Sequence, residues 1–338
     1  MSGSERRLAP VVRLAPAKVN LTLAVTGTRP DGYHALHSVM VPLDLADRLS
    51  VAVLPPGASD TLHASGFDPG PASGNLVLRA ITATRRAARP AWGRPEPPPA
   101  LAARLEKRIP VAAGLAGGSS DAAAAIDAAL EAWAVTLDSA ARAALAAELG
   151  SDVPFFLAGG PALVEGRGER TTPLPWVRDA DPAGDRPGLL LVTPALALST
   201  PAVFAAWDAG ARVDGGAARL ASEHIAAELR TGLRVVDLIA RASVLASAND
   251  LALAASAIEP ALVPFKRALL RLLGRPVGLS GSGPTHWALY PSLAEASSAA
   301  DRLRDAIVTG TLPSPGDREP FVAAVRILGP THDHRRDA

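Results

Sequence analysis

Hydrophobic residues recur along the chain with two spacings, and each spacing predicts one kind of element. Residues 18–25 alternate between apolar and polar side chains, which is typical of a strand with one buried face. The same alternation predicts strands over residues 36–43, 49–54 and 101–109, with Asp47 at the junction between the first two. Residues 57–73 are rich in Gly, Pro and Ser, and they are interpreted as a connection.

Capping residues predict where the helices of the first half begin. Asn75 precedes an apolar-periodic segment and should cap a helix over residues 76–88. Asp138 should cap a second helix, and Asp152 is placed to cap a third. Residues 89–100 are too rich in Pro for regular structure and are predicted to form an exposed inserted loop.

The second half of the chain mixes strands and helices without a regular βα repeat. An apolar stretch at 188–194 predicts a buried strand, residues 276–291 predict two strands around a glycine turn, and 322–328 predict a closing strand. Helices are expected at residues 201–209, 220–228, 235–246, 261–273 and, after a cap at Ser292, 293–307. This irregular order favours an α+β fold over a doubly wound parallel sheet.

A stretch rich in Pro, Asp and Gly at 173–187 predicts a boundary between two domains. The expected organisation is a first domain at 10–175 and a second at 186–330. Residues 1–9 and the tail at 331–338 are expected to be disordered.

Composition excludes several classes of function. The 338 residues carry 34 Lys and Arg against 33 Asp and Glu, so there is no broad cationic field of the kind that nucleic-acid binding needs. The absence of Cys excludes disulfides, thiolate zinc sites and a Cys nucleophile. No apolar run is long enough to span a membrane and residues 1–10 lack the apolar core of a secretory signal, so a cytoplasmic protein is expected. Only three lysines occur, Lys18, Lys107 and Lys266.

The segment at 110–120 is the strongest candidate for chemistry. It places glycines and then two serines between a predicted strand and an Ala-rich helix expected to open at Ser119. Glycines let backbone N–H groups approach an anion, and a helix N-terminus adds partial positive charge, so the segment predicts a phosphate-binding loop. The alternative is an ordinary strand-to-helix turn capped by Ser. A second glycine turn at 279–285 could close over the same phosphate, although alone it is typical of a hairpin.

Single residues elsewhere leave two interpretations each. Lys18 and Asn20 share one strand face, which suits binding of a hydroxyl or phosphate but also fits a solvated face. Asp152 could act as a base rather than a helix cap. Tyr33 and His34 stand in an Asp-Gly-Tyr-His turn that suits recognition of a base or sugar, or a turn anchored by a half-buried Tyr. No metal ligands are predicted.

Four segments in order resemble one known family: 15–51 with Pro-Ala-Lys-Val-Asn and the Asp-Gly-Tyr-His turn, 107–125 with Gly-Leu-Ala-Gly-Gly-Ser-Ser-Asp, 150–169 with Gly-Ser-Asp-Val-Pro, and 279–285. They resemble the 4-diphosphocytidyl-2-C-methyl-D-erythritol kinases, a family of the galactokinase, homoserine kinase, mevalonate kinase and phosphomevalonate kinase superfamily. The resemblance covers residues 10–328. The chain departs from the family pattern where Ala112, Ala113 and Ala116 stand at positions that are often Gly.

The resemblance implies an N-terminal domain like domain 2 of ribosomal protein S5 and a C-terminal ferredoxin-like domain, with the active site between them. It implies ATP-dependent phosphorylation of the 2-hydroxyl of 4-diphosphocytidyl-2-C-methyl-D-erythritol, in the methylerythritol phosphate route to isoprenoid precursors. Mg²⁺ would be bound mainly through the ATP phosphates. A small cytidine diphosphate-linked substrate is the implied partner, with no nucleic acid and no membrane, and the protein is expected to be a monomer or weak homodimer.

The resemblance also assigns roles to residues. Lys18 and Asp152 match the catalytic pair, with Asp152 orienting or accepting the hydroxyl proton. Asn20, Tyr33, His34 and Phe204 match positions that contact the cytidine side. ATP would be bound by Pro110, Val111, Ala112, Ala113, Gly114, Leu115, Ala116, Gly117, Gly118, Ser119 and Ser120, with Asn75 and Lys107 near the adenine.

The sequence leaves three alternative functions. A sister kinase acting on homoserine or a mevalonate would share the fold. A regulator could keep the ATP pocket without the chemistry, although the presence of both Lys18 and Asp152 disfavours this. An RNA-binding role through an S5-like fold is disfavoured by the near-zero net charge.

Overall fold

The computed structural model describes residues 9–177, 186–210, 216–313 and 315–330. The expected disorder at residues 1–8 and 331–338 lies outside the described residues. So does the centre of the predicted domain boundary, at 178–185.

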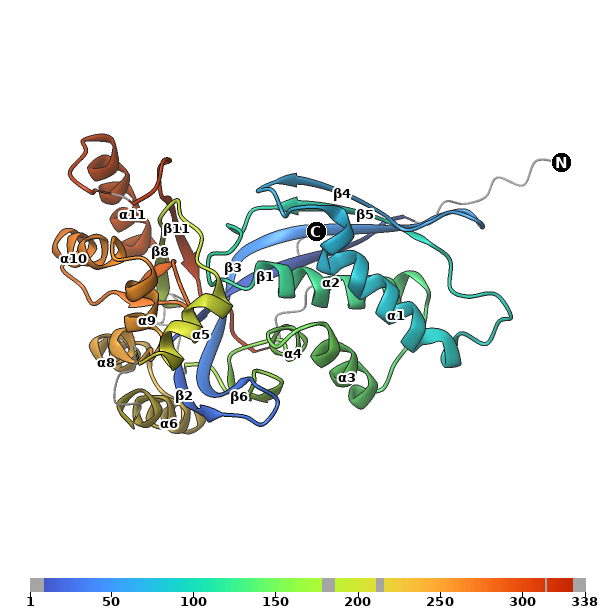
Figure 1. The fold of residues 1–338 in the computed structure, drawn as a ribbon, viewed down its shortest axis with the longest axis horizontal. Helices are drawn as coiled ribbons and strands as arrows, with labels where there is room; N and C mark the ends of the chain where they lie inside the picture. The colour runs from blue at the N-terminus through green and yellow to red at the C-terminus, as the bar shows by residue number, and fades with distance from the viewer. Residues whose placement is uncertain (1–8, 178–185, 211–215, 314, 331–338) are drawn as a thin grey trace.

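The first half of the chain is built on a seven-stranded sheet with the order β4-β5-β3-β6-β7, while β1 and β2 both pair with β3. All pairs are antiparallel except β4 with β5. The strands are β1 (Val11–Asn20), β2 (Ala24–Thr28), β3 (His34–Val53), β4 (Thr61–Gly66), β5 (Leu101–Lys107), β6 (Ala162–Gly166) and β7 (Arg170–Pro173). Figure 1 shows β3 as a long curved strand that reaches from one half of the molecule into the other.

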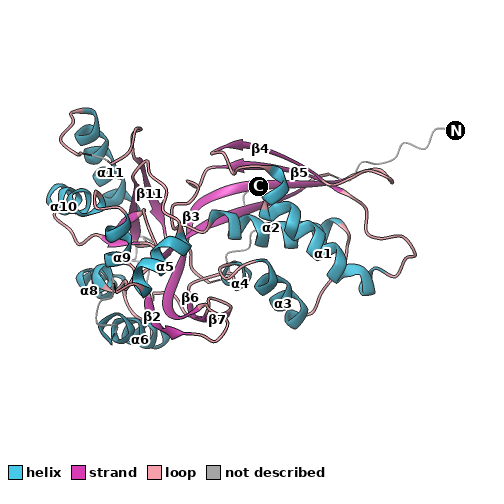
Figure 2. Cartoon of the chain, in the orientation of Figure 1, coloured by secondary structure: helices cyan, strands magenta, loops and turns pink. Residues whose placement is uncertain are grey.

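Helices of the first half pack against one face of this sheet (Figures 1 and 2). They are α1 (Leu76–Trp92), α2 (Gly117–Ala132), α3 (Ser139–Leu149) and α4 (Val153–Leu157), preceded by the 3₁₀ turn η1 (Ala72–Gly74). Helix α2 lies innermost because alanines leave it narrow on every side, and ten of its residues are buried. The side chains of Asn75 and Asp138 cap α1 and α3 as predicted, by accepting the backbone N–H groups of Val77 and Ala141.

The strand predictions for the first half were wrong at three places. The strand expected at 18–25 is divided, because β1 ends at Asn20 and β2 begins only at Ala24. The two strands expected around Asp47 are one continuous β3, because the buried Asp47 carboxylate is satisfied by Lys107 and by the backbone N–H groups of Arg108 and Ile109. The presumed connection at 57–73 contains β4, which exists through its parallel pairing with β5.

The helix α1 also extends beyond the prediction. It continues through Pro90 to Trp92, and Gly93 ends it with a φ of 67° in the left-handed region. The guanidinium of Arg89 donates hydrogen bonds to carbonyls of residues 94–96, which fastens this end. The Pro-rich loop is therefore limited to residues 93–100.

The second half contains a four-stranded antiparallel sheet with the order β11-β8-β10-β9 and seven helices in the described residues. The strands are β8 (Gly188–Thr193), β9 (Gly278–Leu279), β10 (His286–Tyr290) and β11 (Phe321–Arg326). The helices are α5 (Thr200–Asp208), α6 (Gly216–Thr231), α7 (Val235–Ala240), α8 (Ala242–Ser247), α9 (Ala252–Ile258), α10 (Leu262–Leu273) and α11 (Leu293–Val308).

Two features of this half differ from the prediction. The helix expected at 235–246 is divided into α7 and α8 at Arg241, whose backbone is non-helical and whose guanidinium pairs with Glu228. The helix α9 was not predicted, because its seven residues are too few to show a clear period. The cap at Ser292 is confirmed, and α10 ends at residue 273 as predicted, with Gly274 after it in the left-handed region. The mixed sheets and helices confirm the α+β class.

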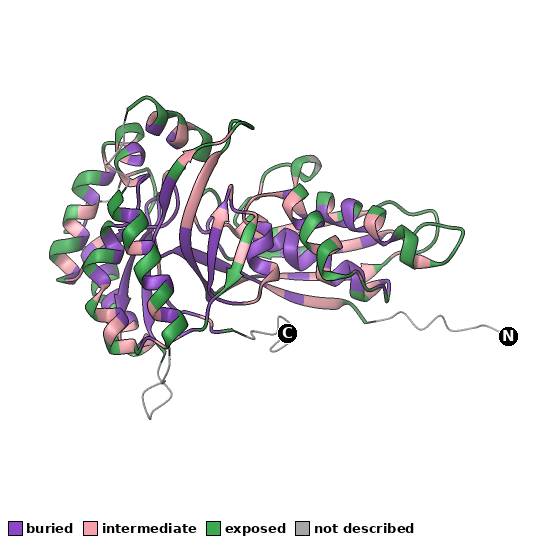
Figure 3. Cartoon of the chain, turned by 90° about the horizontal axis from the view of Figure 1, so that it is seen from below, coloured by how far each residue is buried: buried purple, intermediate pink, exposed green. Residues whose placement is uncertain are grey.

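The two halves share a buried core. Val39 and Val41 of β3 belong to the same apolar cluster as Leu189 of β8 and Trp287 of β10. Figure 3 shows buried residues continuing from one half into the other. None of the helices in the described residues has the length and the apolar composition that a membrane span requires.

The Asp138 cap gives the first prediction. Asp138→Ala should lower the free energy of unfolding by ~1 kcal/mol, because the N–H of Ala141 loses its acceptor while the rest of α3 is unchanged. Urea denaturation measures this. Asp138→Asn retains an oxygen acceptor and is the matched control; equal losses in the two variants would show that the cap is not the cause.

Candidate active site

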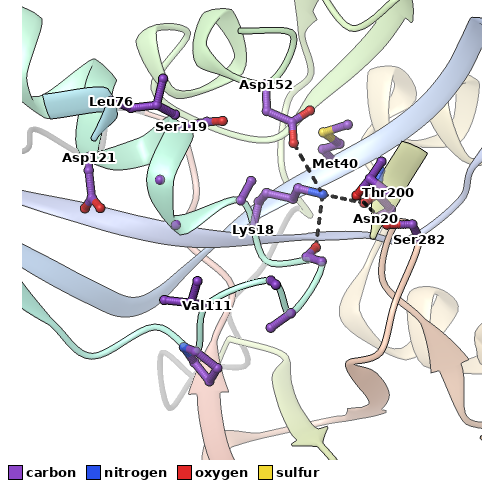
Figure 4. A pocket seen from close by; sticks show the side chains of 18 of the residues that line it. Lys18, Asn20, Met40, Leu76, Val111, Ser119, Asp121, Asp152, Thr200 and Ser282 are labelled. Carbon is purple, nitrogen blue, oxygen red and sulfur yellow. Dashed lines mark hydrogen bonds and ion pairs between the residues drawn. The ribbon is translucent and has the colours of Figure 1, made fainter. Parts of the chain in front are cut away.

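A cavity of about 460 Å³ lies where the two halves meet. Its walls come from β1, from the loop before α2, from the residue before α4, from α5 and from the second glycine turn (Figure 4). Fifteen of the residues predicted as a site line it: Lys18, Asn20, Asn75, Lys107, Pro110, Val111, Ala112, Ala113, Gly114, Ala116, Gly117, Gly118, Ser119, Asp152 and Phe204. Segments far apart in the sequence therefore converge as the motifs indicated.

Lys18 stands at the centre of the polar contacts. Its Nζ donates hydrogen bonds to Asn20 Oδ1 at 2.7 Å and to the carbonyl of Gly114 at 3.1 Å, and it lies 3.8 Å from Asp152 Oδ2 (Figure 4). Burial lowers the pKa of Lys18, and the Asp152 carboxylate opposes that shift. The ammonium is thus held at a fixed point between a carboxylate and the loop before α2.

Asn20 orients this lysine. Its amide nitrogen donates to Ser38 Oγ at 2.8 Å, and that hydroxyl donates to the carbonyl of Thr22, so the amide cannot rotate freely. Lys18 and Asn20 are only 4% and 2% exposed. The solvated-face interpretation of this pair is therefore wrong, because both polar groups are buried and partnered with each other.

Asp152 precedes α4 but does not cap it, since its side chain accepts no hydrogen bond from that helix. The capping prediction is wrong. The carboxylate instead points toward Lys18 and keeps 30% of its side chain exposed in the cavity. A carboxylate that is reachable from the cavity and oriented by an ammonium has the arrangement that a general base needs.

The loop before α2 turns through the left-handed region three times, with φ values of 53° at Ala112, 75° at Gly114 and 54° at Ala116. Ala112 and Ala116 are not Gly, so the left-handed conformation costs ~1 kcal/mol of backbone strain at each of them. Helix α2 begins at Gly117, two residues earlier than predicted. The first N–H groups of a helix lack partners within it, and here they belong to cavity-lining residues, which makes this end suitable for an anion.

The second glycine turn packs directly on the first loop. Ser280 Oγ donates to the Gly114 carbonyl at 2.9 Å, and the N–H of Thr285 donates to the Ala113 carbonyl at 3.3 Å. Gly281 and Ser282 line the same cavity. The two loops are therefore in contact, and their closure over one phosphate stays a prediction.

Sequence reasoning missed two polar residues that shape this wall. The Asn249 side chain donates to the carbonyls of Leu279 and Gly281, both at 2.9 Å, and so holds the second turn in place. Thr200 at the start of α5 shares a 2.8 Å hydrogen bond with Ser282, and both line the cavity. In the sequence, Asn249 and Thr200 look like ordinary turn and cap residues, because the residues that they bond lie 30 to 82 positions away along the chain.

Four predicted residues do not line the cavity. Leu115 is completely buried in the apolar core, and only its carbonyl takes part, by accepting the backbone N–H of Lys18. Ser120 is also buried away from the cavity. Tyr33 is 53% exposed, with the Arg167 guanidinium 5.4 Å from its ring centre. His34 does not line the cavity itself but contacts Phe204, which does.

His34 stacks on Phe204, which does line the cavity, with ring centres 4.7 Å apart. The same imidazole and the ring of Trp207 form a T-shaped pair with centres 5.3 Å apart, and His34 Nε2 lies 3.0 Å from Asp208 Oδ1. These contacts form an aromatic group between the first residue of β3 and helix α5. Flat rings at a cavity wall are suited to stacking on a base.

Among the described residues no group of three or more His, Cys, Asp or Glu side chains is placed to hold a metal ion.

Comparison with known proteins gives the family. The GHMP kinases N terminal domain model matches residues 75–160, and the GHMP kinases C terminal model matches residues 227–309. A curated 4-diphosphocytidyl-2-C-methyl-D-erythritol kinase of Anaeromyxobacter dehalogenans is 39% identical over 86% of this chain and 84% of its own length. A solved 4-(cytidine 5'-diphospho)-2C-methyl-D-erythritol kinase is 32% identical, with a TM-score of 0.66 over 94% of this chain and 99% of its own. A homoserine kinase from Cytophaga hutchinsonii, 16% identical, shares the fold with a TM-score of 0.65 over 98% of each chain.

The contact between the two loops gives the second prediction. A Cβ at Gly114 would lie 2.4 Å from the Ser280 carbonyl oxygen, and its φ is already in the left-handed region. Gly114→Ala should therefore lower the free energy of unfolding by about 2 kcal/mol or more. Gly118→Ala is the matched control, because its Cβ would meet only Leu76 Cδ1 at an ordinary 3.6 Å. Thermal unfolding that ranks the two variants equally would contradict this account of the loop contact.

Proposed function

Since the chain belongs to the GHMP kinases and, within them, to the 4-diphosphocytidyl-2-C-methyl-D-erythritol kinase family, we propose that it transfers the γ-phosphoryl group of ATP to the 2-hydroxyl of 4-diphosphocytidyl-2-C-methyl-D-erythritol. The reaction would serve the methylerythritol phosphate route to isoprenoid precursors. The observation that carries the proposal is the Lys18–Asp152 pair, which faces the loop before α2 across one cavity.

Asp152 is the proposed base. Its carboxylate would orient the acceptor hydroxyl and take the proton as the oxygen attacks the γ-phosphorus and the bond to the bridging oxygen of ADP, the leaving group, breaks. Phosphoryl transfer depends mainly on positioning and charge stabilisation, so a carboxylate is basic enough for this role. Lys18, fixed by Asn20 and the Gly114 carbonyl, would orient the Asp152 carboxylate and stabilise negative charge on the transferred group.

The loop before α2 is the proposed site of the ATP phosphates. Its supports are the unpaired N–H groups at the start of α2 and the cavity-lining hydroxyl of Ser119. Asn75 and Lys107 line the same cavity and are proposed to lie near the adenine. The described side chains do not by themselves form a magnesium site, so we propose that Mg²⁺ enters on the phosphate oxygens, and no step is derived through it.

The aromatic group at the other wall is proposed to bind the cytidine. Phe204 offers a ring at the cavity, and its stacking on His34 keeps that ring in place. The contact of His34 with Asp208 fixes the imidazole orientation. Tyr33, on the neighbouring turn, is exposed and would supply a second face for the base.

Further parts of the proposal rest on the resemblance. These are the S5-like and ferredoxin-like character of the two halves, the domain limits at 10–175 and 186–330, action in the cytoplasm, and a monomeric or weakly dimeric state.

The proposal is tested by incubating the protein with Mg-ATP and a panel of acceptor alcohols that includes the cytidylylated substrate, homoserine and mevalonate. Mass spectrometry should show a gain of about 80 Da, one phosphoryl group, on the cytidylylated alcohol alone. Phosphorylation of homoserine or mevalonate instead would make this a sister kinase. Nucleotide binding without any product would make it a regulator.

Replacing the base gives the third prediction. Asp152→Asn should lower kcat by ~10²–10⁴ while the affinity for ATP stays near that of the wild type, because the amide cannot accept the proton but retains the shape. Steady-state kinetics and nucleotide titration measure the two effects. Asp138→Asn, a carboxylate-to-amide change far from the cavity, should leave kcat unchanged. An Asp152→Asn protein with normal kcat would remove Asp152 from the chemistry.

Loss of an aromatic face gives the fourth prediction. Phe204→Ala and Tyr33→Ala should each raise the KM for the cytidylylated acceptor by roughly 5- to 150-fold, since stacking one base is worth ~1–3 kcal/mol. The KM for ATP should change little. Trp92→Ala removes a ring from the far end of α1 and serves as the control. Unchanged acceptor KM in both aromatic variants would show that the cytidine does not bind at this wall.

A further inference from the structure

Three charged side chains are buried together beneath the loop before α2. The Lys107 ammonium lies between the carboxylates of Asp47 and Asp121, and it is 2.7 Å from Asp121 Oδ2. The three side chains are 3%, 0% and 5% exposed. Two carboxylates share one ammonium, so the cluster carries a net charge of −1 when both acids are ionised and zero when one is protonated.

The two carboxylates are not equivalent. Asp47 Oδ1 accepts the backbone N–H groups of Arg108 and Ile109 at 2.6 and 2.9 Å, so both of its oxygens are partnered. Asp121 Oδ1 is buried and has no hydrogen-bond partner. Burial raises the pKa of Asp121 to about 7, with the Asp47 charge adding to the shift and Lys107 opposing it. Asp121 is therefore the group that gains or loses the proton.

The cluster is placed where its charge acts on an anion at the loop. A Cβ at Gly117, the first residue of α2, would lie 3.1 Å from Lys107 Nζ. Lys107, Asp121 and Gly117 all line the cavity. A negative charge on Asp121 opposes phosphates at this helix end, since their repulsion inside a protein is only weakly screened.

Other charges near α2 are engaged elsewhere. Lys107 of β5 and Asp47 of β3 are the charged groups that act on Asp121. Among the described residues, other ion pairs on the elements around α2 include Arg13 of β1 with Glu131, Arg142 of α3 with Asp127, Arg85 and Arg86 of α1 with Asp60 and Glu148, Glu106 of β5 with Arg108, and Asp152 before α4 with Lys18.

We propose that Asp121 couples nucleotide binding to proton uptake: phosphates bound at the start of α2 favour the protonated form of the Asp47–Lys107–Asp121 cluster. This inference rests on the proposed function, because it places the phosphates of ATP at this loop. Thermodynamic linkage makes the effect reciprocal. The factor by which bound nucleotide raises the proton affinity of Asp121 is also the factor by which protonation of Asp121 raises the affinity for the nucleotide.

Calorimetric titration of the protein with Mg-ADP tests the proposal. The number of protons taken up is obtained at pH 7.5 from buffers of different ionisation enthalpy. If the phosphates favour the proton tenfold, the wild type should take up about half a proton more than Asp121→Asn, which has no proton to gain. From pH 6 to 8.5 the wild-type affinity should fall roughly five- to tenfold relative to that variant.

Asp127→Asn is the matched control, because Asp127 lies on the same helix and faces Arg142 instead of the cavity. It should take up protons like the wild type. Equal uptake by wild type and Asp121→Asn overturns the proposal, and so does a wild type that takes up no proton while binding Mg-ADP, a result that needs no variant to fold. A protein that does not bind Mg-ADP at all contradicts the proposed function itself.

Discussion

The contact between two backbone turns is the constraint on which the site depends. Gly114 of the first loop lies so close to Ser280 and Gly283 of the second that no side chain fits between them. The carbonyl oxygen of Gly114 accepts hydrogen bonds from both the Lys18 ammonium and the Ser280 hydroxyl. Through this one oxygen the N-terminal sheet, the loop before α2 and the C-terminal half are held at fixed distances. The position of Lys18 relative to Asp152 follows from it.

The helix ends and the glycine loops could be predicted from the sequence because they depend on local chemistry. Asn75, Asp138 and Ser292 cap helices with their own side chains, and Gly274 ends one in the left-handed region. Their partners lie within four positions along the chain. Local patterns are sufficient for such features.

Features that depend on distant partners were not predictable in the same way. Asp47 interrupts an apolar pattern and looked like a junction. The strand β3 continues through it because Lys107 and two backbone N–H groups bond its carboxylate, and these partners lie 60 to 62 positions away along the chain, where the local pattern does not show them. Asp152 looked like a helix cap because the sequence does not show that Lys18 faces it. Of the candidate site, the loops and the Lys18–Asp152 pair were found from motifs. Asn249 and Thr200 were not, since their contacts arise only when the second turn is folded.

The length of β3 has a mechanical consequence. One unbroken strand of 20 residues pairs with β1, β2, β5 and β6, and its residues also pack against the second sheet through the shared core. The strand is held least firmly at residues 43–45, where the β1 register shifts between Pro16 and Lys18. The opposite edge carries neither β6, whose pairing ends at Met40, nor β5, whose pairing begins at Arg48. Any bending between the two halves would therefore concentrate at this irregular point of β3, where the fewest ladder hydrogen bonds are broken, and the apolar core that both halves share would oppose it.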